Sequence, residues 1–185
     1  FIYCFKMNKI ITKRLTLNAL LSVFISIPLG FKTPVQAQSN QDCSLALNQV
    51  AEQIYNYGTS INVAEYNNAN DRYIGNPSSR EAMIVFMLGN PIYQDTNSVL
   101  FLENSSTKSD SIAANILNSF QLQQDWANHL VKNCNNLAVV TFAKAYSGWS
   151  NEYAIQTSGL TVPRECLDPA IDSGRFLPWN YTYCT

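Results

Sequence analysis

The sequence has few charged residues and one histidine, and it lacks the short motifs that mark many enzymes. Charged residues make up 14% of its 185 residues, and His129 is the single histidine. No glycine-rich phosphate loop of the GxGxxG or GxxxxGK type occurs, so nucleotide chemistry is not expected. It contains no GxSxG elbow, HExxH, HxH or CxxC motif. We therefore predict neither a cofactor nor a metal.

Positive charge is concentrated near the N-terminus. Five of the twelve basic residues precede residue 38, and all thirteen acidic residues follow it. The remaining seven basic and thirteen acidic residues give residues 38–185 a formal charge of −6. A negatively charged protein is repelled by phosphate backbones and by anionic membrane surfaces. We therefore expect neither nucleic acid nor an anionic membrane surface as a partner.

The N-terminal segment has the three regions of a signal peptide in the correct order. A basic stretch, residues 7–14, precedes an apolar run from Leu15 to Ile27 that Pro28 ends. Val35-x-Ala37 then fits the small-residue rule for signal peptidase, which predicts cleavage after Ala37. A transmembrane anchor is the alternative, but a span needs roughly 20 apolar residues and this run is shorter.

This segment sets the expected domain organisation. Phe1–Lys6 precede Met7, the first methionine, and we interpret them as residues upstream of the true start. Residues 1–37 are thus assigned to the signal peptide with its upstream residues, and residues 38–185 to a single mature α+β domain. Such a protein is expected to be secreted or periplasmic, with no stable membrane span after cleavage.

Two segments have the periodicity of amphipathic helices. A longer pattern begins at Asp110 or Ser111 and continues to about Asn133, and Cys134 lies on its apolar face. A shorter pattern covers residues 40–57, where apolar residues recur at alternating steps of four and three. Its stripe contains these residues: Cys43, Leu47, Val50, Ile54 and Tyr57.

Two apolar runs in the middle of the chain predict strands. Ala82–Leu88 is continuously apolar, which favours a central strand buried on both faces, although a short helix is the alternative. Ser98–Leu102 is a second run that could pair with the first. The polar stretch 59–80 is expected to be a connection, with at most a helical turn near residues 63–66.

The last third of the chain predicts a β-meander. Strands are expected at residues 137–143, 152–157 and 160–162, with turns at Ser147-Gly148 and Ser158-Gly159. The predicted fold class is therefore α+β, with two helices packed on a small, mostly antiparallel sheet and two disulfides.

The cysteines suggest how this fold is held together. Cys43, Cys134, Cys166 and Cys184 remain in the predicted mature chain, and an even number in an exported protein favours two disulfides. Four cysteines allow three pairings. Because Cys43 begins one helix stripe and Cys134 ends the other, two antiparallel helices would bring them together. That geometry favours Cys43–Cys134 and leaves Cys166–Cys184.

Asp125 and His129 form one candidate catalytic pair. They lie four residues apart, so a helix would project both from one face. The pair could orient an imidazole as a general base, or supply two metal ligands. Since a metal site needs a third ligand, an ordinary helix-surface pair is the simpler interpretation. Four glutamates could alternatively pair as glycosidase carboxylates: Glu81, Glu103, Glu152 and Glu165.

Aromatic residues are concentrated near the C-terminus. Exposed tryptophan and tyrosine rings bind glycans and peptides by stacking, with polar tips available for hydrogen bonds. We predict a binding face of Trp149, Tyr153, Trp179 and Tyr181, in which Trp149 lies in a predicted turn. The alternative is that these rings pack over the meander and against a Cys166–Cys184 bridge.

Several C-terminal motifs occur in a fixed order. The segment 134–142 is followed by Ser147-Gly148-Trp149, then by Cys166, then by Pro178-Trp179-Asn180-Tyr181 before Cys184. In these motifs residues 110–185 resemble a group of small exported proteins of unknown function found in cyanobacteria. The resemblance implies export and disulfides, and it implies no catalytic residue.

These patterns favour an exported, non-enzymatic binding or interaction module whose partner is an unknown protein or glycan. A small extracellular hydrolase using Asp125 and His129 is one alternative, and a pocket containing both residues would support it. A purely structural, envelope-associated protein is another, and it predicts neither a pocket nor an exposed aromatic patch.

Overall fold

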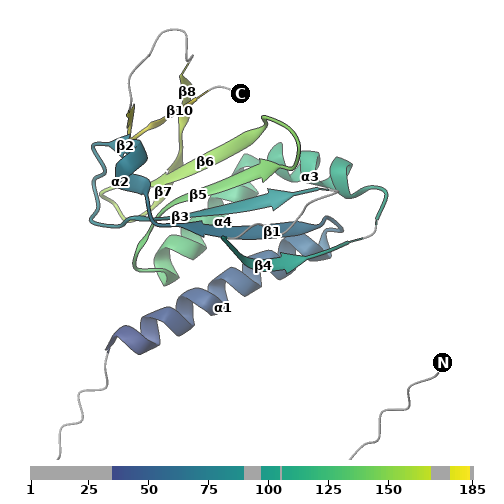
Figure 1. Ribbon diagram of the computed structural model, residues 1–185, viewed down its shortest axis with the longest axis horizontal. Helices are drawn as coiled ribbons and strands as arrows, with labels where there is room; N and C mark the ends of the chain where they lie inside the picture. The colour runs from purple at the N-terminus through teal and green to yellow at the C-terminus, as the bar shows by residue number, and fades with distance from the viewer. Residues whose placement is uncertain (1–34, 90–96, 105, 168–175, 184–185) are drawn as a thin grey trace, which may run out of the picture. The chain divides into compact units, whose positions relative to one another are not determined.

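A six-stranded sheet forms the centre of the fold in the computed structural model, which describes residues 35–89, 97–104, 106–167 and 176–183 (Figure 1). Its strands are β1 (Ile61–Tyr66), β3 (Ala82–Leu88), β4 (Ser98–Leu102), β5 (Leu137–Lys144), β6 (Ser150–Ile155) and β7 (Thr161–Pro163). They lie in the spatial order β4-β1-β3-β5-β6-β7. Among the described pairings within this sheet, only β3–β5 is parallel. A mostly antiparallel sheet, with β5, β6 and β7 as a meander, is therefore confirmed.

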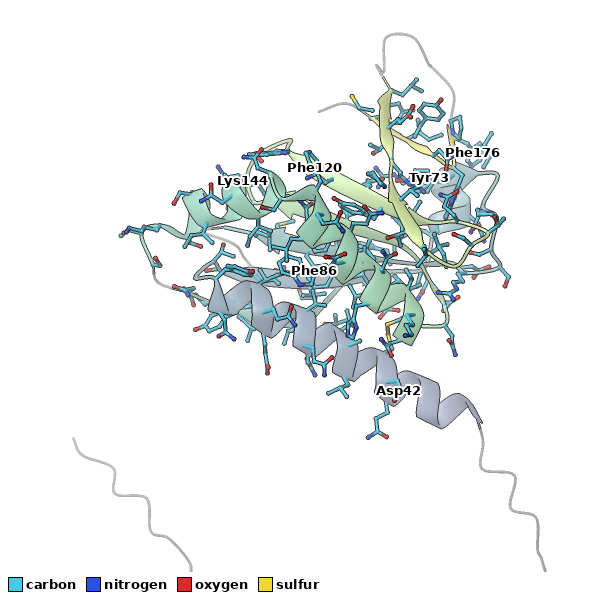
Figure 2. All side chains as sticks on the ribbon, turned by 180° about the vertical axis from the view of Figure 1, so that it is seen from behind. Asp42, Tyr73, Phe86, Phe120, Lys144 and Phe176 are labelled. Carbon is cyan, nitrogen blue, oxygen red and sulfur yellow. A yellow bond between two sulfur atoms is a disulfide. The ribbon has the colours of Figure 1, made fainter. Side chains whose placement is uncertain are left out.

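Three helices cover one face of this sheet, as Figure 1 and the opposite view in Figure 2 show. They are α1 (Val35–Asn56), α3 (Ser109–Leu117) and α4 (Phe120–Asn133). Helix α1 contacts α4 and β1, while α3 and α4 both contact β5. The α+β fold class is confirmed, with three helices on the sheet where two were predicted.

Shorter elements gather beyond one end of the sheet (Figure 1). They are α2 (Ala69–Arg72), β2 (Tyr73–Ile74), β8 (Glu165–Leu167), β9 (Leu177–Pro178) and β10 (Tyr181–Tyr183). Strand β2 pairs with β9, and β8 pairs with β10, both in parallel. The C-terminal tail, for which the sequence has little periodicity, is thus built into two small sheets.

The apolar run of β5 is buried on both faces of the sheet. Ala138, Val139 and Val140 are all fully inaccessible, because alternate side chains enter opposite layers. Phe142 stacks on Phe86 of the neighbouring strand β3, with 5.2 Å between the ring centroids. Figure 2 shows Phe86 beneath the helices. The strands predicted at residues 82–88 and 137–143 are therefore confirmed.

The sequence predicted one continuous helix from Asp110 to Asn133. This prediction is wrong in one respect, because the structure divides the segment into α3 and α4. The carbonyls at the end of a helix lack partners within the helix. Here the buried Gln123 donates its Nε2 to the carbonyls of Ile116 (2.9 Å) and Leu117 (3.1 Å). Asn151 of β6 also donates to Leu117, at 2.8 Å. These side-chain amides satisfy the carbonyls at the end of α3 and permit a turn between α3 and α4. The apolar periodicity of the sequence does not reveal this turn.

The polar connection predicted over residues 59–80 is also wrong in part. Residues 61–66 form strand β1, not a helical turn, and β1 lies between β3 and β4. Strand β4, Ser98–Leu102, therefore pairs with β1. The suggested pairing of Ser98–Leu102 with Ala82–Leu88 is wrong, because β1 lies between these two strands. Ile61 and Val63 occupy alternate positions of β1 and are fully buried. Apolar residues at alternate positions are typical of a strand, so this short pattern could have predicted β1.

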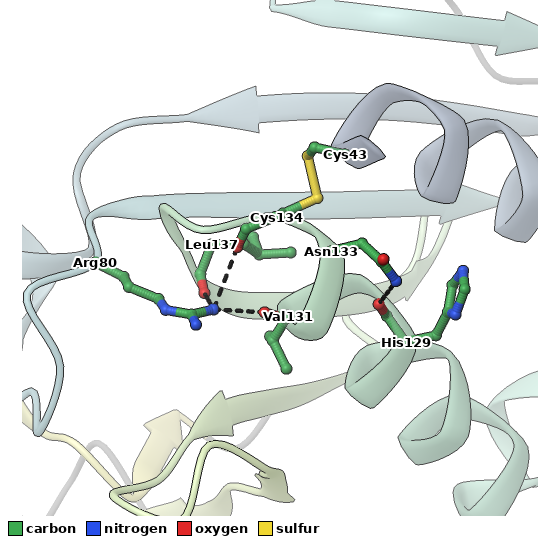
Figure 3. Close-up of a disulfide and its surroundings, with 7 residues drawn as sticks. All are labelled: Cys43, Arg80, His129, Val131, Asn133, Cys134 and Leu137. Atoms are coloured by element: carbon green, nitrogen blue, oxygen red, sulfur yellow. Dashed lines mark hydrogen bonds between the residues drawn. A yellow bond between two sulfur atoms is a disulfide. The ribbon is translucent and has the colours of Figure 1, made fainter. Parts of the chain in front are cut away.

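The predicted Cys43–Cys134 disulfide is present, with 4.5 Å between the two Cα atoms. It joins the N-terminal half of α1 to the residue that follows α4, as the antiparallel-helix geometry predicted (Figure 3). Further along the predicted stripe of α1, Val50 and Ile54 are buried. Tyr57, which follows the end of α1 at Asn56, is exposed.

The second predicted disulfide and the leader involve residues outside the described ranges. Cys166 is disulfide-bonded, but Cys184 is not among the described residues, so the Cys166–Cys184 pairing stays a prediction. The predicted signal peptide falls almost entirely on residues 1–34, which are likewise outside them. Of the helices in the described ranges, none is both long and apolar enough to span a membrane.

Replacing both Cys43 and Cys134 by serine should lower the free energy of unfolding by about 4–5 kcal/mol. The bond closes a loop with a sequence separation of 91 residues, so its removal releases the unfolded chain from a long constraint. Urea unfolding of the variant and the parent protein, both oxidised, would measure the difference. A loss below about 1 kcal/mol would contradict a stabilising role for this bond.

Candidate functional site

A groove with a volume of about 820 Å³ lies between the N-terminal half of α1 and the helix-covered face of the sheet. Its floor is apolar and is formed by Val63 of β1, Ile84 of β3 and Leu137 of β5. Leu47 of α1 and Leu100 of β4 form its sides. Ligand sites in proteins typically occupy roughly 300–1,000 Å³ and are mostly apolar. The groove therefore has the volume of a binding site and an apolar floor, while about half of its lining is polar.

Polar side chains line the opening of the groove. Ser44 and Asn48 extend from α1, while Asn135 and Asn136 follow the end of α4, and all four are exposed. The Asn136 side chain accepts a hydrogen bond from the backbone of residue 81 at 3.2 Å, which fixes its position. Among the described lining residues, Glu65 is the only acidic or basic side chain.

One wall of the groove is the Cys43–Cys134 disulfide itself. The end of α4 that carries Cys134 is held from the other side by Arg80 (Figure 3). Arg80 Nη1 donates to the carbonyl of Val131 at 2.6 Å and to those of Cys134 and Leu137 at 3.2 Å each. A cation satisfying carbonyls at a helix C-terminus stabilises that end. The disulfide wall therefore has a rigid support.

A second cluster of charged and aromatic groups lies at the other end of the fold and is buried. Arg164 lies between two rings, with its guanidinium carbon 3.4 Å from the Tyr73 ring centroid and 4.8 Å from that of Trp179. Glu152 Oε2 lies 3.6 Å from Arg164 Nη1 and accepts a 2.7 Å hydrogen bond from the Tyr73 hydroxyl. Arg72, which is half-exposed, approaches the other Glu152 oxygen at 3.7 Å.

Burial controls the ionisation of this cluster. Burial and the neighbouring Glu152 carboxylate raise the pKa of Tyr73, against a smaller opposing effect of the two arginines. Burial lowers the pKa of Arg164, while Tyr73 and Glu152 act in the opposite direction. Arg164 also donates from Nη1 to the carbonyl of Tyr181 at 3.2 Å. The cluster therefore joins β2, β6 and the C-terminal tail, and we assign it a structural role.

Asp125 and His129 are both exposed on α4, and each bonds to a different glutamine. Asp125 Oδ1 accepts a hydrogen bond from Gln121 at 2.9 Å, and His129 Nε2 lies 3.1 Å from Gln49 Oε1 of α1. Neither side chain lines the groove. Within the described residues, no three histidine, cysteine, aspartate or glutamate side chains meet as metal ligands.

The four predicted aromatic binding residues do not form one exposed face. Tyr153 is fully buried and donates its hydroxyl to the carbonyl of Phe120 at 3.1 Å. Trp179 is 5% exposed and donates its Nε1 to the carbonyl of Ile155 at 2.8 Å. Trp149 and Tyr181 are half-buried. Because their hydroxyl and indole groups find partners inside the fold, Tyr153 and Trp179 belong to the core.

The sequence patterns did not predict the residues that line the groove. Glu65 lies in the stretch expected to be a polar connection, and Asn135 and Asn136 lie between the predicted helix and the strand predicted at residues 137–143. Their common position becomes visible only when β1 enters the sheet beside β4. One usable signal was present, since the predicted Cys43–Cys134 pairing already placed Ser44 close to Asn135.

Arg164→Ala should lower the free energy of unfolding by about 3–5 kcal/mol, because it leaves the buried Glu152 carboxylate without its closest buried cation. Arg72→Ala is the matched control, and we expect it to cost at most about 1 kcal/mol because Arg72 is half-exposed. Denaturant unfolding at neutral pH would measure both. Equal losses in the two variants would contradict the role assigned to Arg164.

Stability should also fall in alkali. Burial raises the pKa of Tyr153 to about 12 and raises that of Tyr73 as well. In the unfolded chain a tyrosine loses its proton near pH 10. Stability is therefore complete below about pH 10 and declines as the pH rises towards 12, because the unfolded state binds fewer protons.

Denaturant unfolding at a series of pH values would reveal this decline. The matched variant, Tyr73→Phe with Tyr153→Phe, removes both groups, so its stability should depend less on pH above pH 10. Identical slopes in the variant and the parent protein would show that other groups cause the decline.

Comparisons with known protein families, with curated proteins and with solved structures found no match to this chain. The resemblance of residues 110–185 to exported cyanobacterial proteins therefore stays a prediction. The function of this chain is therefore inferred from the groove, from the residues that line the groove and from the disulfide that forms one of its walls.

Proposed function

We propose that this chain is an exported, disulfide-stapled binding module that holds its partner in the groove beside α1 and does not catalyse a reaction. The observation that supports this most directly is the groove itself, an apolar floor surrounded by exposed amide and hydroxyl groups. An apolar floor provides affinity, and a few fixed polar groups orient what is bound.

The proposed location outside the cytoplasm is supported by the disulfide. Cys43–Cys134 joins two helices and forms part of the groove, so the site depends on an oxidised pair of thiols. Structural disulfides persist in the periplasm and in secreted proteins, and they are rare in the cytosol. This agrees with a mature domain of residues 38–185 that follows a cleaved leader.

The non-enzymatic character is supported by the chemistry of the groove. Among its described lining residues, Glu65 is the only carboxylate, and neither histidine nor an unpaired thiol is present. Hydrolases that act through a covalent intermediate use a nucleophile activated by an adjacent general base. The alternative hydrolase would need Asp125 and His129, which bond to separate glutamines away from the groove.

A fragment screen by saturation-transfer NMR on the exported protein would test this function. We expect small amphipathic fragments to bind, and Ser44→Trp to abolish their binding, because the indole would fill the opening of the groove. Leu45→Trp is the matched control, since Leu45 is the next residue on α1, is 57% exposed and does not line the groove.

Two results would contradict the proposal. One is that no fragment binds to the parent protein. The other is that the Ser44→Trp and Leu45→Trp proteins bind fragments equally well, which would place binding outside the groove.

A further inference from the structure

We propose that the groove binds a small aliphatic molecule with one ammonium group, whose carbon chain lies on the floor and whose N–H groups point to Glu65. This identification rests on the proposed binding function and specifies the chemistry of the ligand. Three properties of the described lining support it: a single negative charge, aliphatic side chains beside that charge, and the absence of aromatic rings.

Glu65 supplies the charge that selects the ligand. It is exposed, and among the described residues no group forms an ion pair or a hydrogen bond with its carboxylate. The described lining of the groove contains no basic side chain that could balance this charge. Residues 38–185, with seven basic and thirteen acidic residues, carry a formal charge of −6, which attracts cations and repels anions. The complementary ligand is therefore a cation.

The floor of the groove beside Glu65 is aliphatic. Glu65 of β1 lies opposite Ile84 of β3 in the sheet register, so their side chains are neighbours on one face. Ala82 lies two residues before Ile84 on the same face and pairs with Leu137 of β5. All four residues line the groove. A ligand whose charged head lies at Glu65 therefore places its carbon chain on aliphatic side chains.

The chemistry of the lining also indicates which kind of cation fits. Sites for quaternary ammonium groups surround the ligand with aromatic rings, and none of the described lining residues is aromatic. An ammonium that keeps its N–H groups is favoured instead, because it donates charge-assisted hydrogen bonds to a carboxylate. The side chains of Ser44, Asn48 and Asn135 have no hydrogen-bond partner among the described residues, and their oxygens provide further acceptors at the opening.

Calorimetric titration of the exported protein with n-octylamine, n-octanol and octanoate would test the selection by charge. We expect the amine to bind most tightly and the carboxylate least tightly, because only the amine is a cation that can pair with Glu65. In the Glu65→Gln protein the affinity for n-octylamine should fall about two- to fivefold, as for an exposed ion pair. Glu52→Gln removes the same charge from an exposed residue of α1 outside the described groove lining, and it should leave the affinity unchanged.

Two further probes separate the contact with the floor from the contact with the head group. Affinity should rise about two- to fourfold per added methylene from n-butylamine through n-hexylamine to n-octylamine, because each methylene leaves water for the aliphatic floor. Octyltrimethylammonium has the charge and the chain of n-octylamine but no N–H group, so it should bind more weakly. Ser44→Trp should abolish binding of n-octylamine as it does that of fragments, because both occupy the groove.

Three sets of outcomes would overturn the identification of the ligand. If fragments bind the groove but n-octylamine binds no better than n-octanol, or Glu65→Gln behaves like Glu52→Gln, the selection for a cation is wrong while the proposed binding function stands. If octyltrimethylammonium binds as tightly as n-octylamine, or if chain length has no effect, the assigned contacts at the head or at the floor are wrong. If neither fragments nor amines bind, the proposed function itself fails.

Discussion

Burial of β5 on both faces is the constraint on which the rest of the fold depends. Residues such as Val139 and Val140 point to opposite sides of the sheet and are fully buried, so both faces near β5 must be covered. Helices α3 and α4 cover one face. On the other side, Glu152 of β6 is buried with Arg164 and Tyr73. The second cover thus differs from the first in containing a buried ion pair among aromatic residues.

The groove is a consequence of how α1 meets this arrangement. The C-terminal half of α1 is closely packed, with Ala51 and Ile54 fully buried. Its N-terminal half leaves Leu47 partly accessible above β1 and β4. The disulfide holds this half at a set distance from the end of α4, where Arg80 satisfies three carbonyls. Rigid supports on two sides keep an apolar cleft open that would otherwise be favoured to collapse.

Much of the secondary structure could be predicted because it follows local periodicity. The stripe containing Val50 and Ile54 and the apolar run of β5 are signals within single segments. The break between α3 and α4 could not be predicted in this way, since Gln123 looks like a surface residue until Asn151 of β6 is brought beside it. The disulfide between Cys43 and Cys134 could be predicted because the prediction required only that two helices pack in antiparallel directions.

The candidate site was less predictable than the fold. Trp179 and Tyr153 look like surface platforms when judged by residue type, yet their hydrogen bonds to Ile155 and Phe120 place them inside. The groove, in contrast, uses Asn136 and other residue types that occur in any loop. Their importance arises from long-range pairing of strands, which one sequence does not display.

Because the Cys43–Cys134 disulfide forms one wall of the groove, the groove depends on a covalent bond that forms only when both thiols are oxidised. A newly synthesised chain whose Cys43 and Cys134 are still thiols lacks the covalent link that holds α1 beside α4. Under the proposed function, the binding site would be complete only once these two thiols have been oxidised to the disulfide.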